Sequence, residues 1–74
     1  MHLIGLLNER GIRGRQVAWL LKHFSQDHIA QQITFYDFEL SFPQRALLPK
    51  WAASPWLLYR IKQNVPPPAD YSDR

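Results

Sequence analysis

The sequence predicts an all-α domain, a compact bundle of three to four short helices with an extended, proline-rich C-terminal tail. Apolar residues recur at helical spacing in three successive segments between residues 2 and 40. A fourth apolar stripe follows Ser54 and Pro55, a pair that is typical of the start of a helix. Three consecutive prolines close this stripe at residues 66–68, because proline cannot continue a helix.

The first two helices are predicted at about residues 2–10 and 14–24. Gly11 follows the first apolar run, at the position where glycine commonly takes the left-handed conformation and ends a helix. The second helix has the most regular helical spacing in the chain. Its apolar positions are Val17, Ala18, Leu20, Leu21 and Phe24. We expect this face to be buried, with Leu21 at its centre.

The third helix is predicted at about residues 26–40, with Ser25 as its N-cap and Pro43 as its end signal. Aromatic residues near its end also favour a strand, but a single strand would have no partner in this chain. We therefore favour the helix. Its buried stripe is expected to comprise Ile29, Ile33, Tyr36 and Leu40, widened by Phe35 and Phe38.

The fourth helix is predicted to start at Pro55, with Ser54 as its cap, and to end near Asn64 or Val65. The residues before it, 43–54, are expected to form an irregular connection that includes one helical turn. This prediction places Trp51 outside any long helix.

We expect residues 1–65 to form a single helical domain and residues 66–74 to form an extended, partly disordered tail. Proline fixes its own backbone angle, so Pro66, Pro67 and Pro68 are expected in polyproline II. Nothing in the sequence indicates a repeat or a second domain.

The composition is typical of a small cytoplasmic protein without disulfides. The chain has 74 residues, a net charge of +3 and no cysteine, so packing alone must hold the fold. No apolar run reaches the roughly 18 residues that span a bilayer, and the N-terminus lacks the features of a signal peptide. Residues 1–65 hold eight basic and four acidic residues, a balance that suits a nucleic-acid partner.

No reaction centre is recognisable in the sequence. His2, His23 and His28 do not share one helical face as a zinc pair would, and we expect them at the surface. Asp37 and Glu39 point in different directions on the third helix. No serine lies in a nucleophile-elbow motif and no glycines form a phosphate loop. We predict a non-enzymatic protein with no catalytic residue, metal, cofactor or small-molecule substrate.

Basic residues gather at the turn that leads into the second helix. Arg10, Arg13 and Arg15 flank this turn, where free backbone N–H groups add to the attraction for a phosphate. Lys22 lies about two turns beyond Arg15, so both can follow one phosphate strand. The candidate DNA-binding residues are Arg13, Arg15, Lys22, Arg60 and Lys62. The simpler alternative is that they are solvated charges with no partner.

The chain also contains three tryptophans, Trp19, Trp51 and Trp56. In so small a domain these large rings are expected mainly in the core. Trp19 is the exception, because it lies at the edge of the apolar face of its helix and is expected to be partly exposed. Such rings also stack on bases in proteins that bind single strands. If the chain instead binds another protein, we expect the contact surface at Trp19, Phe42 and Trp51.

The last helix carries the spacing Ser-Pro-x-Leu-Leu-x-x-Ile before its prolines. Together with residues 6–18 and 28–38, this C-terminal segment resembles the C-terminal helical module of bacterial plasmid and phage replication initiator proteins. That module is similar to DnaD-like domains. The residues that match the C-terminal segment of the module are Ser54, Pro55, Leu57, Leu58, Ile61, Pro66 and Pro67. Two features differ: the 74 residues hold no winged-helix domain, and Val65 replaces the tryptophan of the DnaD-like pattern Tyr-x-x-x-Ile-x-x-x-Trp.

The resemblance implies a helical module that takes part in DNA replication or a related DNA transaction, with DNA or a replication protein as its partner. Combined with the basic residues, it leads us to expect a non-enzymatic interaction module that contacts DNA phosphates. The alternative is a protein–protein interaction module with an aromatic surface and no affinity for nucleic acid. Salt dependence separates the two, because phosphate contacts weaken steeply with salt and apolar contacts do not.

Overall fold

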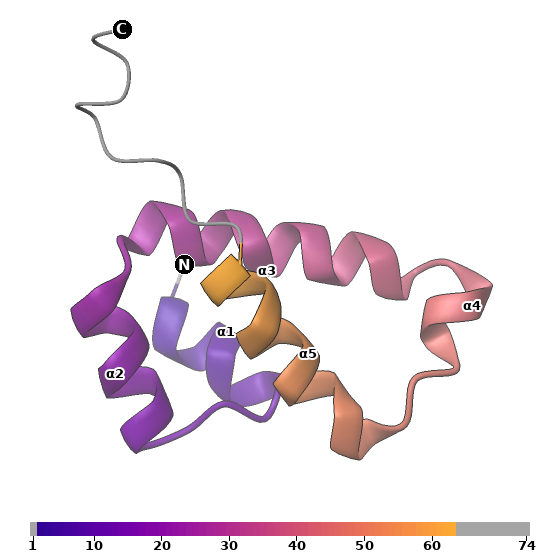
Figure 1. Cartoon of the computed structure of the whole chain (residues 1–74), viewed down its shortest axis with the longest axis horizontal. Coiled ribbons are helices and arrows are strands. Elements are labelled where there is room, and N and C mark those ends of the chain that lie inside the picture. Colours follow the sequence, from indigo (N-terminus) through magenta and orange to yellow (C-terminus); the bar gives the residue numbers. More distant parts are fainter. Residues whose placement is uncertain (1, 64–74) are drawn as a thin grey trace, which may run out of the picture.

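The longest described helix, α3 (Gln26–Leu40), is the element against which most of the others pack. The computed structural model describes residues 2–63, apart from the side chains of Arg45 and Lys50. In Figure 1, α3 runs along one side of the molecule, with α2 at one of its ends and α4 at the other. The remaining helices are α1 (Leu3–Glu9), α2 (Arg15–His23), α4 (Pro43–Ala46) and α5 (Lys50–Gln63).

The predicted all-α fold class is confirmed: residues 2–63 contain five helices, one of them a single turn, and no strand. The first three helices lie within one or two residues of their predicted bounds. The proline-rich tail and the predicted domain boundary at residue 65 lie outside the described residues. One core joins the four longer helices. Its members are Leu7, Ile12, Val17, Leu20, Ile29, Ile33, Tyr36, Leu57 and Ile61.

Gly11 ends α1 in the way that the sequence predicts. Its φ is +89°, and the Ile12 N–H donates to the Leu7 carbonyl at 2.9 Å while the Gly11 N–H donates to the Asn8 carbonyl at 3.0 Å. These two bonds form a Schellman motif, with the fully buried Ile12 as its apolar contact. Gly11 also faces Ser54 of α5, since a Cβ on Gly11 would lie 3.2 Å from the Ser54 Cβ.

Replacing Gly11 by alanine is therefore expected to lower stability for two reasons. The left-handed conformation costs an L-residue about 1–2 kcal/mol, and the new methyl would also push α1 away from α5. The same change in a Ser54→Gly chain is the matched control, because it keeps the backbone cost at Gly11 and removes the Ser54 Cβ that the new methyl would meet. We expect Gly11→Ala to lower the urea midpoint more in the unmodified chain than in the Ser54→Gly chain. Equal falls in the two chains would show that the contact between Gly11 and Ser54 adds no cost.

The N-cap of α3 is also confirmed, because the Ser25 hydroxyl accepts a hydrogen bond from the His28 N–H at 3.1 Å. Ile29, Ile33 and Tyr36 are buried as predicted. The expectation that Phe35 and Phe38 widen this buried face is wrong, since both side chains are exposed. Phe38 packs edge-on against Phe42, which is itself exposed, so aromatic character alone does not place a ring of α3 in the core.

The predicted start of the last helix is wrong, since α5 begins at Lys50 and Pro55 lies inside it. The added first turn buries apolar surface: Ala53 packs against the core. Pro55 lacks the N–H that would bond to the Trp51 carbonyl, a loss that normally disfavours proline within a helix. Tertiary packing of this turn outweighs the local start signal. The predicted end near Asn64 or Val65 lies outside the described residues.

His28 is buried rather than at the surface as expected. Its Nε2 lies 2.8 Å from the Ile61 carbonyl, which can only accept, so Nε2 carries the hydrogen and donates. Ile61 lies in the last turn of α5 that the structure describes. A side chain of α3 is thus bonded to the backbone of α5.

Two expectations about burial along α2 and α5 also need correction. Leu20, not Leu21, is the fully buried residue of α2, whereas Leu21 is only partly buried. The Trp51 side chain is 80% exposed and does not contribute to the core. None of the described helices is long and apolar enough to span a bilayer.

Candidate nucleic-acid interface

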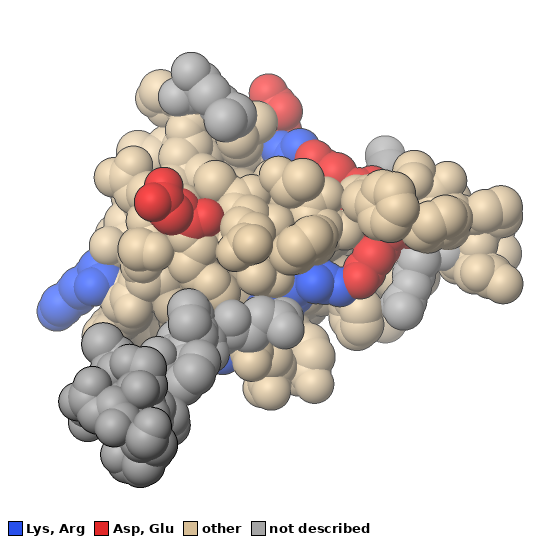
Figure 2. All heavy atoms as spheres, turned by 90° about the horizontal axis from the view of Figure 1, so that it is seen from above, with Lys and Arg blue, Asp and Glu red and all other residues tan. Residues whose placement is uncertain are grey.

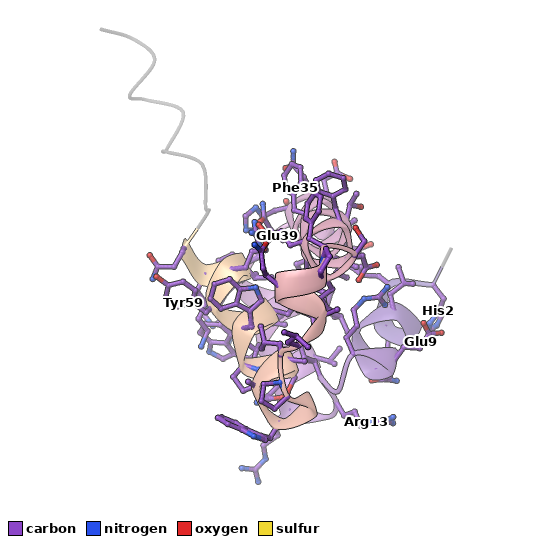
Figure 3. The ribbon with its side chains drawn as sticks, turned by 90° about the vertical axis from the view of Figure 1, so that its right-hand side faces the viewer. His2, Glu9, Arg13, Phe35, Glu39 and Tyr59 are labelled. Atoms are coloured by element: carbon purple, nitrogen blue, oxygen red, sulfur yellow. The ribbon has the colours of Figure 1, made fainter. Side chains whose placement is uncertain are left out.

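Three of the predicted site residues lie on one face of α2. Arg15, Trp19 and Lys22 follow each other at intervals of four and three residues, which places them one above the other along the helix. All three side chains are exposed. Arg13 precedes α2 and extends away from the body of the molecule (Figure 3). Arg15, Trp19 and Lys22 therefore form one face of α2, and Arg13 lies beside the start of that helix.

Lys62 joins this surface from α5. Its Nζ lies over the indole ring of Trp19, 4.9 Å from the ring centroid, within the range of a cation–π interaction. Between the two helices is an open cavity of about 260 Å³. It is lined by Arg15, Gln16, Trp19, Leu58 and Lys62. We call Arg13, Arg15, Trp19, Lys22 and Lys62 the α2 surface.

The ring of Trp19 is held in place although it is 44% exposed. The His23 ring lies 4.5 Å from it and the Phe24 ring lies edge-on at 5.8 Å. Phe24 in turn lies 5.6 Å from His28, the residue that is bonded to the backbone of α5. This row of rings connects Trp19 to the core, so the exposed part of the indole needs little ordering when it binds a ligand.

The N-terminus of α2 adds a second source of positive potential. Its N-cap is Gly14, which has no side chain that could bond to the first-turn N–H groups. Such N–H groups and the helix dipole attract anions. Because Arg13 and Arg15 flank this end of the helix, the electrostatic contributions of side chains and backbone have the same sign.

Arg10, which the sequence grouped with Arg13 and Arg15, does not belong to the α2 surface. Its guanidinium donates to both carboxylate oxygens of Asp37 on α3, at 2.9 and 2.5 Å, and to the Leu6 carbonyl at 2.6 Å. The hydrogen bond with Asp37 raises the pKa of Arg10 above its ordinary value. Arg10 therefore ties the end of α1 to α3.

Arg60, another of the predicted DNA-binding residues, is engaged in an ion pair within the fold. The Arg60 guanidinium pairs with the Glu39 carboxylate, which projects from α3 (Figure 3). The Arg60 side chain is only 17% exposed. A guanidinium held in this way cannot reach a phosphate without breaking the pair. The ion pair joins α3 to α5, and Lys62 is the residue of this segment that faces outward.

The structure does not bring together the three residues of the predicted protein-binding surface. Trp19 lies on α2, whereas Phe42 precedes α4 and Trp51 lies in the first turn of α5, at the other end of the molecule (Figure 1). Phe42 packs edge-on against Phe38 at 5.0 Å. Trp51 lines a separate apolar cavity of about 430 Å³. It is lined by Leu48, Trp51, Ala52, Pro55, Trp56 and Tyr59.

The face formed by α3 differs from the α2 surface. Seen from that side, charged side chains are few and scattered among uncharged ones (Figure 2). A phosphate backbone would find little electrostatic attraction there. The contrast indicates that α2, with the end of α5, is the side on which to look for an anionic partner.

An open cavity of about 550 Å³ lies between α1, α3 and α5. Tyr36 and Asp37 line it, but Asp37 is bound to Arg10. Burial, with a smaller contribution from the Asp37 charge, raises the pKa of Tyr36 above its ordinary value. The phenol therefore stays protonated at neutral pH. Across residues 2–63 no group of three or more His, Cys, Asp and Glu side chains could hold a metal ion.

The sequence analysis did not predict that Leu58 and Lys62 of α5 lie beside Trp19 of α2. A signal was present, because Leu58 and Lys62 are four residues apart on α5 and Arg15 and Trp19 are four apart on α2. Each pair places a cation beside an apolar side chain on one face. The sequence does not reveal that the two faces lie against each other.

No family model matches the chain, and no curated protein and no solved structure is significantly similar to it. The resemblance to replication initiator modules therefore stays a prediction.

Proposed function

We propose that the chain is a small, non-enzymatic helical module that binds DNA through the phosphates, acting in DNA replication or a related DNA transaction in the cytoplasm. The observation that supports this function best is the composition of the α2 surface. It comprises four exposed cations, three of which lie beside the half-exposed Trp19 while the fourth, Arg13, precedes α2. Within residues 2–63 none of the four has a carboxylate partner. The cations of Arg10 and Arg60 are ion-paired instead.

Unpaired cations on one surface are what a phosphate backbone recognises. Each Lys or Arg that neutralises a phosphate releases a counterion, so the affinity falls with salt in proportion to the number of contacts. Four contacts correspond to a slope of about −3 in a plot of log K against log salt for single strands. Affinity is then expected to fall about fifty-fold between about 50 and 200 mM salt.

A non-enzymatic role is supported by the state of the groups that could react. Asp37, which lines the 550 Å³ cavity, is held by Arg10, and the Tyr36 beside it remains protonated. A general base needs a free path to its substrate and must be able to take up a proton at the working pH. Asp37 lacks the free path, and the protonated Tyr36 cannot take up a proton.

The proposal predicts that Arg13/Arg15/Lys22→Ala removes most of the salt-sensitive DNA binding and leaves the contact that Lys62 makes. Anisotropy titrations with labelled DNA at about 50 and 200 mM salt measure both the affinity and its slope. We expect the slope of log K against log salt to become less steep by about 2, since three phosphate contacts are lost. The control is Arg45/Lys50→Ala, which removes two positive charges at the α4 end of the molecule and should leave most of the affinity.

Equal loss of binding in both variants would mean that net charge, not the α2 surface, attracts the DNA. Absence of binding by the unmodified chain at about 50 mM salt would contradict the proposed function.

Protein binding is the second candidate function, and the apolar surface at the α4 end favours it. Leu47 and Trp51 are largely exposed there beside the 430 Å³ cavity, and exposed apolar patches often mark protein interfaces. Binding at this site would resist salt, unlike phosphate contacts. A partner whose affinity is lost with Trp51→Ser and unchanged between about 50 and 200 mM salt would support this function.

A further inference from the structure

We infer that the α2 surface binds single-stranded DNA in preference to duplex, with one base stacked on Trp19. This inference rests on the proposed function and names the form of DNA that the same site takes. The motivating observation is an aromatic ring, surrounded by cations, at the edge of an open cavity between α2 and α5. Proteins that bind single strands combine stacking rings with a basic path for the backbone.

The cavity has the size and lining of a base-stacking site. Its volume of about 260 Å³ is below the range of pockets that enclose a drug-sized ligand, so it suits one planar ring at the surface. Leu58 supplies an apolar wall, and the Gln16 amide can both donate and accept hydrogen bonds. Trp19 supplies the π surface, held by His23 and Phe24.

The cations lie where the backbone on either side of a stacked base would run. Arg15 is four residues before Trp19 and Lys22 is three after it, so the Cα atoms of the two basic residues are about 10 Å apart along the helix axis, with Trp19 between them. Lys62 covers the ring from α5. A base that stacks on Trp19 would displace the Lys62 ammonium, which is then free to pair with a neighbouring phosphate.

Duplex DNA cannot use this site in the same way. Its bases are stacked on one another, and a protein ring reaches a base face only by unstacking a step, which costs a few kcal/mol. A single strand exposes its base faces without that cost. Duplex can therefore use the cations of the α2 surface but not the ring, and the difference between the two forms should depend on Trp19.

The test measures the binding of a labelled dT strand of about 12 nucleotides and of the matching dA·dT duplex. At about 50 mM salt we expect the unmodified chain to bind the single strand more tightly. Trp19→Leu should weaken single-strand binding about tenfold, leave duplex binding unchanged and keep the salt slope. Trp19→Phe keeps a π face and should recover most of the loss.

Trp51→Leu is the matched control, because it removes an exposed tryptophan at the other end of the molecule and should change neither affinity. Circular dichroism of each variant establishes that the fold is intact. Unchanged single-strand binding in folded Trp19→Leu, or an equal loss for both DNA forms, overturns the stacking inference while leaving the phosphate-binding function in place. If the unmodified chain binds neither form, the proposed function fails and the inference fails with it.

Discussion

Leu20→Ala is expected to leave the domain largely unfolded at room temperature. The Leu20 side chain is fully buried at the centre of the core, where α2 meets the other helices. Replacing such a leucine by alanine costs about 2–5 kcal/mol, the higher values applying where the surroundings cannot close the cavity. Domains below about 70–80 residues rarely exceed about 3–5 kcal/mol of stability. The loss therefore approaches the whole free energy of unfolding.

Leu21→Ala is the control for this prediction. It makes the same chemical change in the same helix, but Leu21 is only partly buried, so we expect a loss of about 2 kcal/mol or less. Helix propensity cannot explain the difference, because it is the same for both variants. Thermal unfolding followed by circular dichroism separates them, since each 1 kcal/mol shifts the melting temperature by about 4–8 °C in a domain of this size. A greater loss from Leu21→Ala would contradict the orientation of α2.

Elements bounded by local signals could be predicted from the sequence. Ser25 caps α3 through its own hydroxyl, and Gly11 ends α1 through its own backbone conformation. Each signal acts within a few residues, so it works the same way wherever the helix later packs. The bounds of α1, α2 and α3 follow from such signals together with apolar spacing.

The start of α5 could not be predicted because it depends on residues far away in the sequence. Ser54 and Pro55 form a convincing local start, yet the helix extends back to Lys50. The extra turn packs Ala53 on the core and places Ser54 against Gly11. Those contacts exist only once α1 and α5 are assembled. Local propensity is a weak guide when packing of this kind competes with it.

The candidate site shows the same division. Arg15, Trp19 and Lys22 share a face of one helix, so their spacing alone predicts that they lie together. By contrast, Arg10 pairs with Asp37 at a separation of 27 residues, and Arg60 pairs with Glu39 at a separation of 21. Charge in the sequence does not reveal which cations the fold pairs internally. The structure pairs Arg60 with Glu39, whereas Lys62 is exposed and lies over Trp19.

The second large effect is expected from Arg60→Met, which should lower stability without weakening DNA binding by the folded chain. The Arg60 guanidinium and the Glu39 carboxylate are both mostly buried between α3 and α5. Removing one partner of a fully buried pair costs about 3–5 kcal/mol. Because both side chains here retain some exposure, we expect about 1–3 kcal/mol. Urea unfolding measures this loss.

The same pair provides an internal control for stability. Glu39→Leu alone should also destabilise the chain, since it leaves the Arg60 charge without its carboxylate. The double variant Glu39→Leu/Arg60→Met removes both charges and should recover part of the loss. Fully additive losses would show that the two side chains do not interact in solution.

Lys62→Met makes the matching change two residues away and should have the opposite result. Lys62 is exposed and lies over Trp19, so stability should be unchanged while single-strand affinity falls and the salt slope shrinks by about 0.7. If Arg60→Met weakened DNA binding with no loss of stability, Arg60 would belong to the interface and its pairing with Glu39 would be incidental. If Lys62→Met changed neither the affinity nor the slope, Lys62 would make no phosphate contact and the interface would be confined to α2 and the turn before it.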